Sequence, residues 1–242
     1  MQQIECIEIA RATVAETFPE SVGSMLVGSI ARGETKPHSD IDLIVLEKSL
    51  RKPFRETFFG GGKQIEVFVH TFETLIHALH QDVLIRKACH ISMCCDALVL
   101  HDEGETCRAL KKIAKQLHKR GPCPLSLDEM ALIRHEVVNL MEDLQDSTDS
   151  FEQFVIVDNL VERCMEYHSC IFRHWNGFGR WKIRELRAFN PIAAETLLNA
   201  VETFFAAGDS KPLLQFAKWL FAKDPQYIAA KVPEIGSLAK TG

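Results

Sequence analysis

Two aspartates separated by one residue, Asp40 and Asp42, open an apolar run that ends at Leu46. Alternate residues of a β-strand point to the same face, so this spacing predicts two carboxylates directed at one site. Carboxylates beside a buried strand are costly unless they are paired or bind a cation, and hard divalent cations prefer oxygen ligands. The pattern therefore predicts a site for one or two Mg²⁺ ions at the mouth of a sheet.

A second polar feature, Gly28-Ser29, follows the apolar run Met25–Val27 shortly before the aspartates. Glycine lets the backbone approach a ligand closely. Ser29, at the start of a helical turn, can offer its hydroxyl and a free backbone N–H to a phosphate. A phosphate cradle that faces metal-binding carboxylates predicts chemistry on a nucleoside triphosphate.

The order and spacing of these residues carry a family resemblance. The segments GSIARG (residues 28–33) and SDIDL (residues 39–43) resemble the signature of the DNA polymerase β-type nucleotidyltransferase superfamily. Within it, the chain resembles the small bacterial branch of minimal and kanamycin-type nucleotidyltransferases, which carry a helical C-terminal domain. The resemblance implies transfer of a nucleoside monophosphate from a triphosphate, with ATP as the expected donor, to an acceptor hydroxyl with release of pyrophosphate.

The resemblance also implies roles for individual residues. The superfamily has a third carboxylate on a neighbouring strand, and Glu66, in the expected strand 63–69, fits that position. Its task would be metal ligation or deprotonation of the acceptor. The predicted metal ligands and catalytic residues are Asp40, Asp42 and Glu66, and the predicted phosphate contacts of this domain are Gly28, Ser29 and Arg32.

Length and composition limit the class of protein. A chain of 242 residues with 46% hydrophobic and 25% charged residues fits one large or two modest globular domains. The net charge of −5 gives no overall basic footprint, so a nucleic-acid partner is not expected. No apolar run approaches the ~20 residues that span a bilayer. Eight cysteines without a C-x-x-C pair, and no secretory leader pattern, predict reduced thiols in the cytoplasm.

Periodicity and turn residues predict a mixed α/β domain followed by helices, an α+β fold with an all-α C-terminal bundle. In the first part we expect helices at 4–18, 71–85 and 105–120, a short helix from Ser29, strands ending at Gly28 and at 41–46, 63–69 and 97–100, and a connector at 50–62. The break Gly121–Pro124 places the boundary between a catalytic domain, 1–121, and a helical substrate or partner domain, 122–242. Short loops between its amphipathic helices predict antiparallel packing.

One tract of the second domain, residues 176–182, contains glycines, basic residues and a tryptophan, and it resembles the Gly-Lys-Trp tract of kanamycin-type enzymes. The resemblance implies that Arg180, with Lys182 beside it, contacts the triphosphate. Asn176 stands where those enzymes carry an acidic base, so the base remains open. If Glu66 only ligates metal, Asp143 of the acidic helix 126–146 is the next candidate. Glu142 and Asp146 share a face of that helix, which is either simply solvated or meets a cationic acceptor such as an amino sugar.

The sequence leaves three functions open. A small-molecule acceptor, with an aminoglycoside-like compound as one candidate, is the first; a homodimer, as in kanamycin-type relatives, is compatible with it. An antitoxin-like enzyme that adenylylates or binds a protein partner is the second, and a non-catalytic nucleotide-binding regulator is the third. The spacing of Arg163 and His168 also resembles the R-x4-H pair of HEPN ribonucleases, although chance is the simpler explanation of so short a pattern.

Overall fold

The computed structural model describes residues 3–227. The chain forms two compact units, Met1–Pro122 and Cys123–Gly242. The first is a mixed α/β unit and the second is helical, which confirms the predicted fold class. In the part of the chain that the structure describes, no helix has the length and apolarity that crossing a membrane requires.

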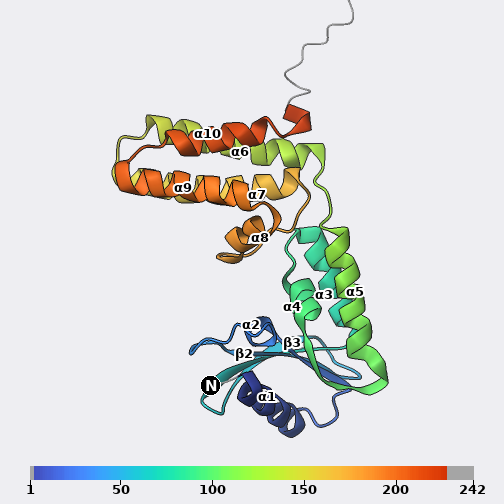
Figure 1. The fold of residues 1–242 in the computed structure, drawn as a ribbon. Coiled ribbons are helices and arrows are strands. Elements are labelled where there is room, and N and C mark those ends of the chain that lie inside the picture. The colour runs from blue at the N-terminus through green and yellow to red at the C-terminus, as the bar shows by residue number, and fades with distance from the viewer. Residues whose placement is uncertain (1–2, 228–242) are drawn as a thin grey trace, which may run out of the picture. The chain divides into compact units, whose positions relative to one another are not determined.

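The first unit is built on a five-stranded sheet in the order β3-β4-β2-β1-β5 (Figure 1). β2 and β4 run parallel, whereas the other neighbouring strands are antiparallel. The strands are β1 (Gly23–Val27), β2 (Ile41–Leu46), β3 (Phe54–Gly60), β4 (Lys63–His70) and β5 (Leu98–Asp102). The helices are α1 (Gln3–Thr17), α2 (Gly28–Ala31), α3 (Phe72–Ile85), α4 (Cys89–Asp96) and α5 (Thr106–Arg120), with the 3₁₀ turn η1 (Glu103–Glu105).

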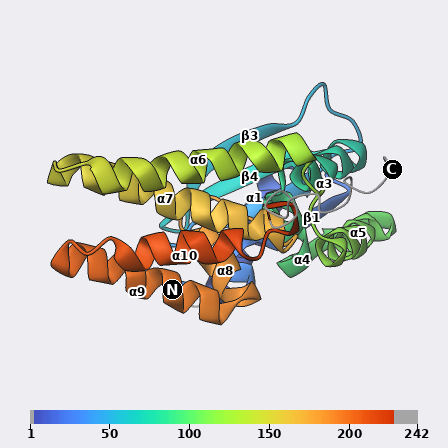
Figure 2. The same ribbon diagram turned by 90° about the horizontal axis from the view of Figure 1, so that it is seen from above.

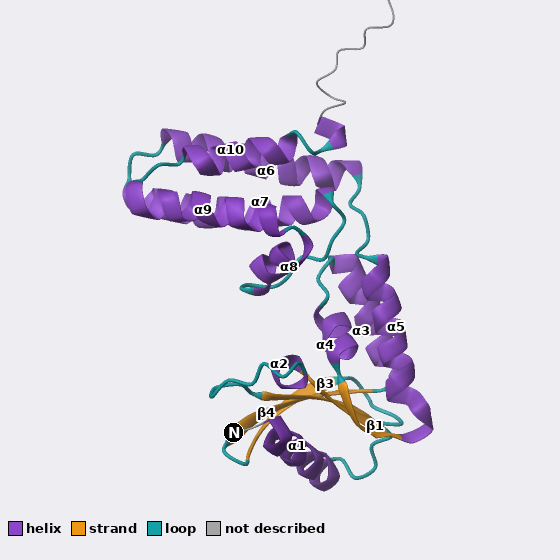
Figure 3. Ribbon diagram, viewed as in Figure 1, coloured by secondary structure: helices purple, strands orange, loops and turns teal. Residues whose placement is uncertain are grey.

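Helix α1 covers one face of this sheet, and α3, α4 and α5 lie on the other (Figure 3). Cys6, Ala10 and Val14 of α1 pack in one buried cluster with alternate residues of the central strands, including Leu43 and Val67. Because neighbouring strand residues point to opposite faces, Asp42 and Glu66 are directed away from α1. The hydrophobic pattern of the two central strands thus decides on which face the carboxylates stand.

The sequence pattern predicts a connector at residues 50–62, but the structure forms the edge strand β3 within it. Nearly all of it is exposed, and polar Arg55, Glu56 and Thr57 interrupt its apolar residues, so no two-residue hydrophobic alternation marks it. Its antiparallel pairing with β4, from Phe54↔Val69 to Gly60↔Lys63, holds this segment as a strand, although its side-chain pattern does not predict one. The turn at Gly61-Gly62, where both residues have positive φ, closes this hairpin.

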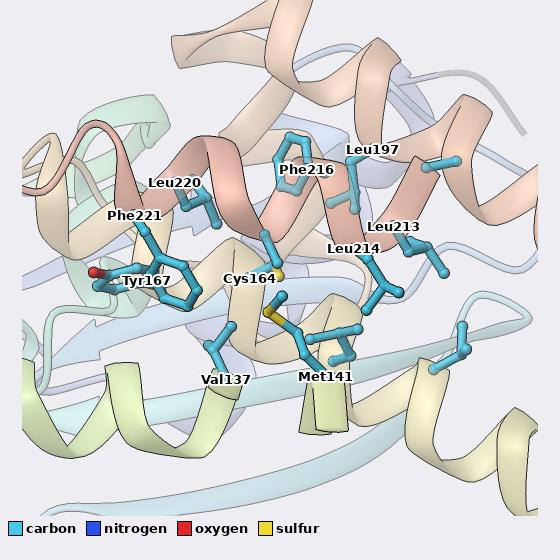
Figure 4. Packing of buried hydrophobic residues seen from close by; sticks show 14 of the residues in the cluster. Val137, Met141, Cys164, Tyr167, Leu197, Leu213, Leu214, Phe216, Leu220 and Phe221 are labelled. Atoms are coloured by element: carbon cyan, nitrogen blue, oxygen red, sulfur yellow. The ribbon is translucent and has the colours of Figure 1, made fainter. Parts of the chain in front are cut away.

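The second unit is an α-helical bundle. Its helices are α6 (Leu127–Asp146), α7 (Ser150–Ile171), α8 (Trp181–Phe189), α9 (Pro191–Ala207) and α10 (Lys211–Phe221). The four longest run alongside one another, and their side chains form one core (Figures 2 and 4). As its sequence predicts, α6 begins with a capping box between Ser126 and Glu129.

A chain of hydrogen bonds joins two buried histidines of the bundle. His174 Nδ1 lies 2.9 Å from the carbonyl oxygen of Trp175, which can only accept, so this nitrogen carries the proton. His174 Nε2 therefore accepts from His168 Nδ1 at 2.8 Å, and His168 Nε2 faces the side-chain amide of Asn190 at 3.4 Å. This order of donors requires both imidazoles to be neutral. Burial, together with the neighbouring His174, lowers the pKa of His168 to about 3, and burial lowers that of His174 to about 4.

Because both pKa values lie below that of an unfolded histidine, the unfolded chain binds more protons below about pH 6.5. We expect the free energy of unfolding of the bundle to fall as the pH drops below that value, by on the order of 2 kcal/mol at pH 5. All three tryptophans, Trp175, Trp181 and Trp219, lie in this unit, so denaturant titration followed by tryptophan fluorescence reports on it selectively. The double variant His168→Phe/His174→Phe should show a shallower pH dependence. The exposed-site control His135→Gln should keep the wild-type slope, and an equal slope in the double variant would contradict the assignment.

Candidate active site

The glycine of the Gly28-Ser29 turn lies directly against the second aspartate. β1 ends at Val27, which pairs with Asp42 of β2. Gly28 follows with φ of 73°, and a Cβ atom at this position would lie 2.1 Å from Asp42 Oδ2. Only glycine accommodates both this left-handed backbone and this close approach. The glycine expected to sit close to a ligand therefore also makes room for a carboxylate.

Parallel pairing of the central strands places the second acidic residue. Asp42 of β2 is in register with Glu66 of β4, so both carboxylates stand side by side on the face opposite α1. Asp40 precedes the first residue of β2. Burial raises the pKa of Asp42 to about 6, with further upward contributions from Glu66 and Asp40. The three predicted carboxylates therefore lie close enough for Glu66 and Asp40 to raise the pKa of Asp42.

A cation that the sequence did not reveal compensates this cluster. The guanidinium of Arg55, on the edge strand β3, donates a hydrogen bond to the Glu66 carboxylate and lies 5.2 Å from the centre of the Phe68 ring. Its charge, and that of Arg32, lower the pKa of Asp42 against the effects of burial and neighbouring carboxylates. The sequence does not predict this role of Arg55, because the pattern indicates a connector where β3 lies. An exposed arginine in a connector gives no sign of a carboxylate partner on another strand.

The carboxylates have the donor chemistry of a Mg²⁺ site, but they are not arranged as a complete coordination site. Among residues 3–227, no group of three or more His, Cys, Asp or Glu side chains is arranged to hold a metal ion. One oxygen of Glu66 is paired with Arg55. Hard oxygen donors and an excess of negative charge nevertheless fit a divalent cation.

The predicted phosphate contacts lie next to the carboxylates but have protein partners of their own. Ser29 Oγ is 3.4 Å from Ser39 Oγ, in the loop that leads to Asp40. Arg32 contacts Glu34 at 3.4 Å and Asp96 at 3.5 Å, so its guanidinium is already shared between two carboxylates. The Gly-Ser turn, the loop and the first aspartate are therefore one connected segment.

The two residues of the second unit that are predicted to contact the triphosphate, Arg180 and Lys182, lie at the start of α8. Lys182 is 8% exposed, and its ammonium forms an ion pair with Glu162 of α7. Arg180 is exposed at the residue before α8, and Asn176 is buried. The ammonium of Lys182 is thus already engaged by one carboxylate, and its phosphate-binding role stays a prediction.

Within residues 123–227, the other candidates of the bundle lie in different surroundings. Asp143, like its neighbours Glu142 and Asp146, is exposed on α6. Arg163 pairs with two glutamates, Glu136 at 3.1 Å and Glu166 at 2.7 Å, whereas His168 is fully buried in the histidine chain. These contacts separate the two residues of the R-x4-H pattern and favour its chance origin.

Comparison with a family model identifies the type of domain in the first unit. Residues 7–93 match the family model described as "Nucleotidyltransferase domain", a segment that runs from α1 into α4 and includes the three acidic residues. The match supports the nucleotidyltransferase superfamily for this part of the chain, as the motif predicts.

The comparison extends to solved structures and to curated proteins. The chain is similar to a nucleotidyltransferase-like protein from Exiguobacterium sibiricum 255-15, with 11% sequence identity and a TM-score of 0.48; the alignment covers 92% of this chain and 78% of that one. No curated protein matches the sequence.

The raised pKa of Asp42 has a consequence for stability in the presence of EDTA. The folded chain binds more protons than the unfolded chain between the ordinary aspartate pKa and about pH 6, so stability falls as the pH rises through this range. We expect Asp42→Asn to raise the free energy of unfolding at pH 7 by about 1–2 kcal/mol, after allowance for solvent screening. At pH 4 the variant should resemble the wild type. Differential scanning calorimetry measures the effect, with the exposed-site variant Glu20→Gln as control; a destabilised Asp42→Asn protein at pH 7 would refute the repulsion.

A matched pair of variants distinguishes the effect of the close contact at Gly28 from the effect of its left-handed backbone. Gly28 and Gly33 have φ of 73° and 76°, but a Cβ atom meets no other atom within 4 Å at Gly33. Both alanine variants should lose about 1 kcal/mol of stability from the left-handed backbone. Only Gly28→Ala should also displace the Asp42 carboxylate and weaken Mn²⁺ binding, measured by electron paramagnetic resonance. Equal Mn²⁺ affinity in the two variants would show that the contact is unimportant.

Proposed function

We propose that the protein is a Mg²⁺-dependent nucleotidyltransferase that moves a nucleoside monophosphate from a triphosphate to an acceptor hydroxyl and releases pyrophosphate. ATP is the expected donor. The observation that carries the proposal is the in-register pair of Asp42 and Glu66 beside Gly28, within the matched nucleotidyltransferase domain. The first unit supplies this chemistry, and the helical unit is assigned to the acceptor.

In this proposal Asp40 and Asp42 are the metal ligands. Bound Mg²⁺ supplies charge neutralisation of the triphosphate and of the leaving pyrophosphate, and it lowers the pKa of a bound hydroxyl. With a pKa of about 6, Asp42 is mostly ionised at neutral pH and can act as a ligand there. Protons compete for this carboxylate at lower pH, so cation binding weakens as the pH falls.

Glu66 is the third ligand or the base that accepts the hydroxyl proton. Arg55 bonds only one carboxylate oxygen, Oε1, so either role can use the second oxygen or follow release of Arg55. The Arg55 side chain is 58% exposed, so it can move without breaking a packed core. Movement of Arg55 would leave both oxygens of Glu66 to ligate a divalent cation or to accept the hydroxyl proton. Ser29 and the Gly28 backbone are assigned to the β- and γ-phosphates, with Arg32 as an electrostatic support.

The acceptor is a small molecule in the version of the proposal that we favour, with an amino sugar as the candidate compatible with the exposed acidic residues of α6. The test is incubation with labelled ATP, CTP, GTP or UTP, Mg²⁺ and a panel of acceptors that includes amino sugars and cellular protein. Label on a small molecule supports this version, label on a protein supports the antitoxin-like one, and nucleotide binding without transfer supports a regulator.

Removing either metal-binding aspartate should abolish transfer. We expect Asp40→Ala and Asp42→Ala to lower kcat by more than the roughly 100-fold that loss of an outer-shell partner causes, because each removes a ligand. Calorimetric melting should show that both variants remain folded, and Glu20→Gln should retain full activity. Turnover of a folded aspartate variant at the wild-type rate would eliminate the mechanism.

A further inference from the structure

A buried lysine holds the loop that leads to the first aspartate. Lys63, the first residue of β4, is 7% exposed, and its ammonium donates to the carbonyl oxygens of Pro37 and Ser39 at 2.9 Å each and of Lys36 at 3.3 Å. An ammonium has three N–H donors, so these three carbonyls use its full capacity. Lysine is rarely buried unless its charge is satisfied. Here the partners are backbone atoms of one loop.

Asp40 depends on this loop for its position. The pairing of β2 with β4 begins at Ile41, so Asp40 lies just outside the ladder. Ser39 N donates to the Lys36 carbonyl at 3.0 Å, and Lys36 N donates to Ser39 Oγ at 2.9 Å, which closes a turn immediately before it. The Ser39 carbonyl held by Lys63 belongs to the same rigid peptide plane as the nitrogen of Asp40. Fixing that oxygen therefore fixes the direction in which the chain enters Asp40.

The same lysine connects the other parts of the site. Ser39, which accepts from Lys36 and is bonded to Lys63 through its carbonyl, also contacts Ser29 of the Gly-Ser turn. Lys63 stands three residues before Glu66 on β4. One side chain thus ties the loop before Asp40, and through Ser39 the Gly-Ser turn, to the strand that carries Glu66.

We propose that Lys63 is a positioning residue, which holds Asp40 where it can share a divalent cation with Asp42. This inference rests on the proposed function. A simpler account would give Lys63 only a charge-balancing role among the carboxylates. The two accounts predict effects of opposite sign. Removing a nearby positive charge alone would tighten cation binding, because it removes a Coulombic repulsion, whereas freeing Asp40 would weaken binding.

The experiment measures Mn²⁺ affinity, with electron paramagnetic resonance of the free ion as the readout, in wild type, Lys63→Met and Lys63→Arg. Lys52→Met is the matched control, because Lys52 is an exposed lysine of the same unit. We expect Lys63→Met to weaken binding about tenfold, Lys63→Arg to recover part of the loss and Lys52→Met to match the wild type. In an Asp40→Asn background, Lys63→Met should add little, because both changes remove the same interaction.

A second readout does not depend on the metal. Hydrogen exchange of the amides in residues 36–40, followed by mass spectrometry, should be faster in Lys63→Met than in wild type or Lys52→Met. If Lys63→Met does not fold, Lys63→Gln, which keeps an amide donor, replaces it in both measurements. Unchanged or tighter Mn²⁺ binding in a folded variant, or unchanged exchange, would overturn the positioning role while leaving the proposed function intact. Failure of the wild-type chain to bind Mn²⁺ would instead overturn both.

Discussion

Carboxylates that stand together in a partly buried place repel one another, and the first unit is arranged around that repulsion. Asp42 and Glu66 occupy matching positions of parallel strands, so strand pairing forces them together whether or not their charges favour it. Burial and like charge raise the pKa of Asp42, which shows that the cluster opposes its own ionisation. A fold that accepts this cost provides the environment in which the proposed function places a divalent cation.

Two cations near the cluster have different relations to it. Arg55 contacts a carboxylate directly from an exposed edge strand, so it neutralises charge and can be displaced. Lys63 is buried and contacts backbone carbonyls, so an incoming cation does not compete for its partners. The first arrangement suits a contact that can be exchanged. The second suits a support that stays fixed.

The parts of this site that the sequence predicts are those determined locally. The D-x-D spacing, the Gly-Ser turn and the apolar strand around Glu66 each have a short-range signature, and the alternation of β4 fixed the face of Glu66 relative to its buried neighbours. Arg55 and Lys63 could not be predicted, because their roles depend on partners in other segments. Nothing in Gly62-Lys63 distinguishes a lysine of a hairpin turn from one buried beneath a loop, and β3 lacks a hydrophobic period.

Two short patterns of the bundle show how little such a pattern determines about the surroundings of its residues. Lys182 and His168 are residue types that often act in catalysis, and both were placed in short patterns with functional relatives. In the structure each is buried and bonded inside the helical unit: Lys182 to Glu162, and His168 to His174. Short patterns on helices are weak evidence because the helix sends nearby residues to different faces. Arg163 and His168 show this directly, since one contacts glutamates at the surface and the other lies in the core.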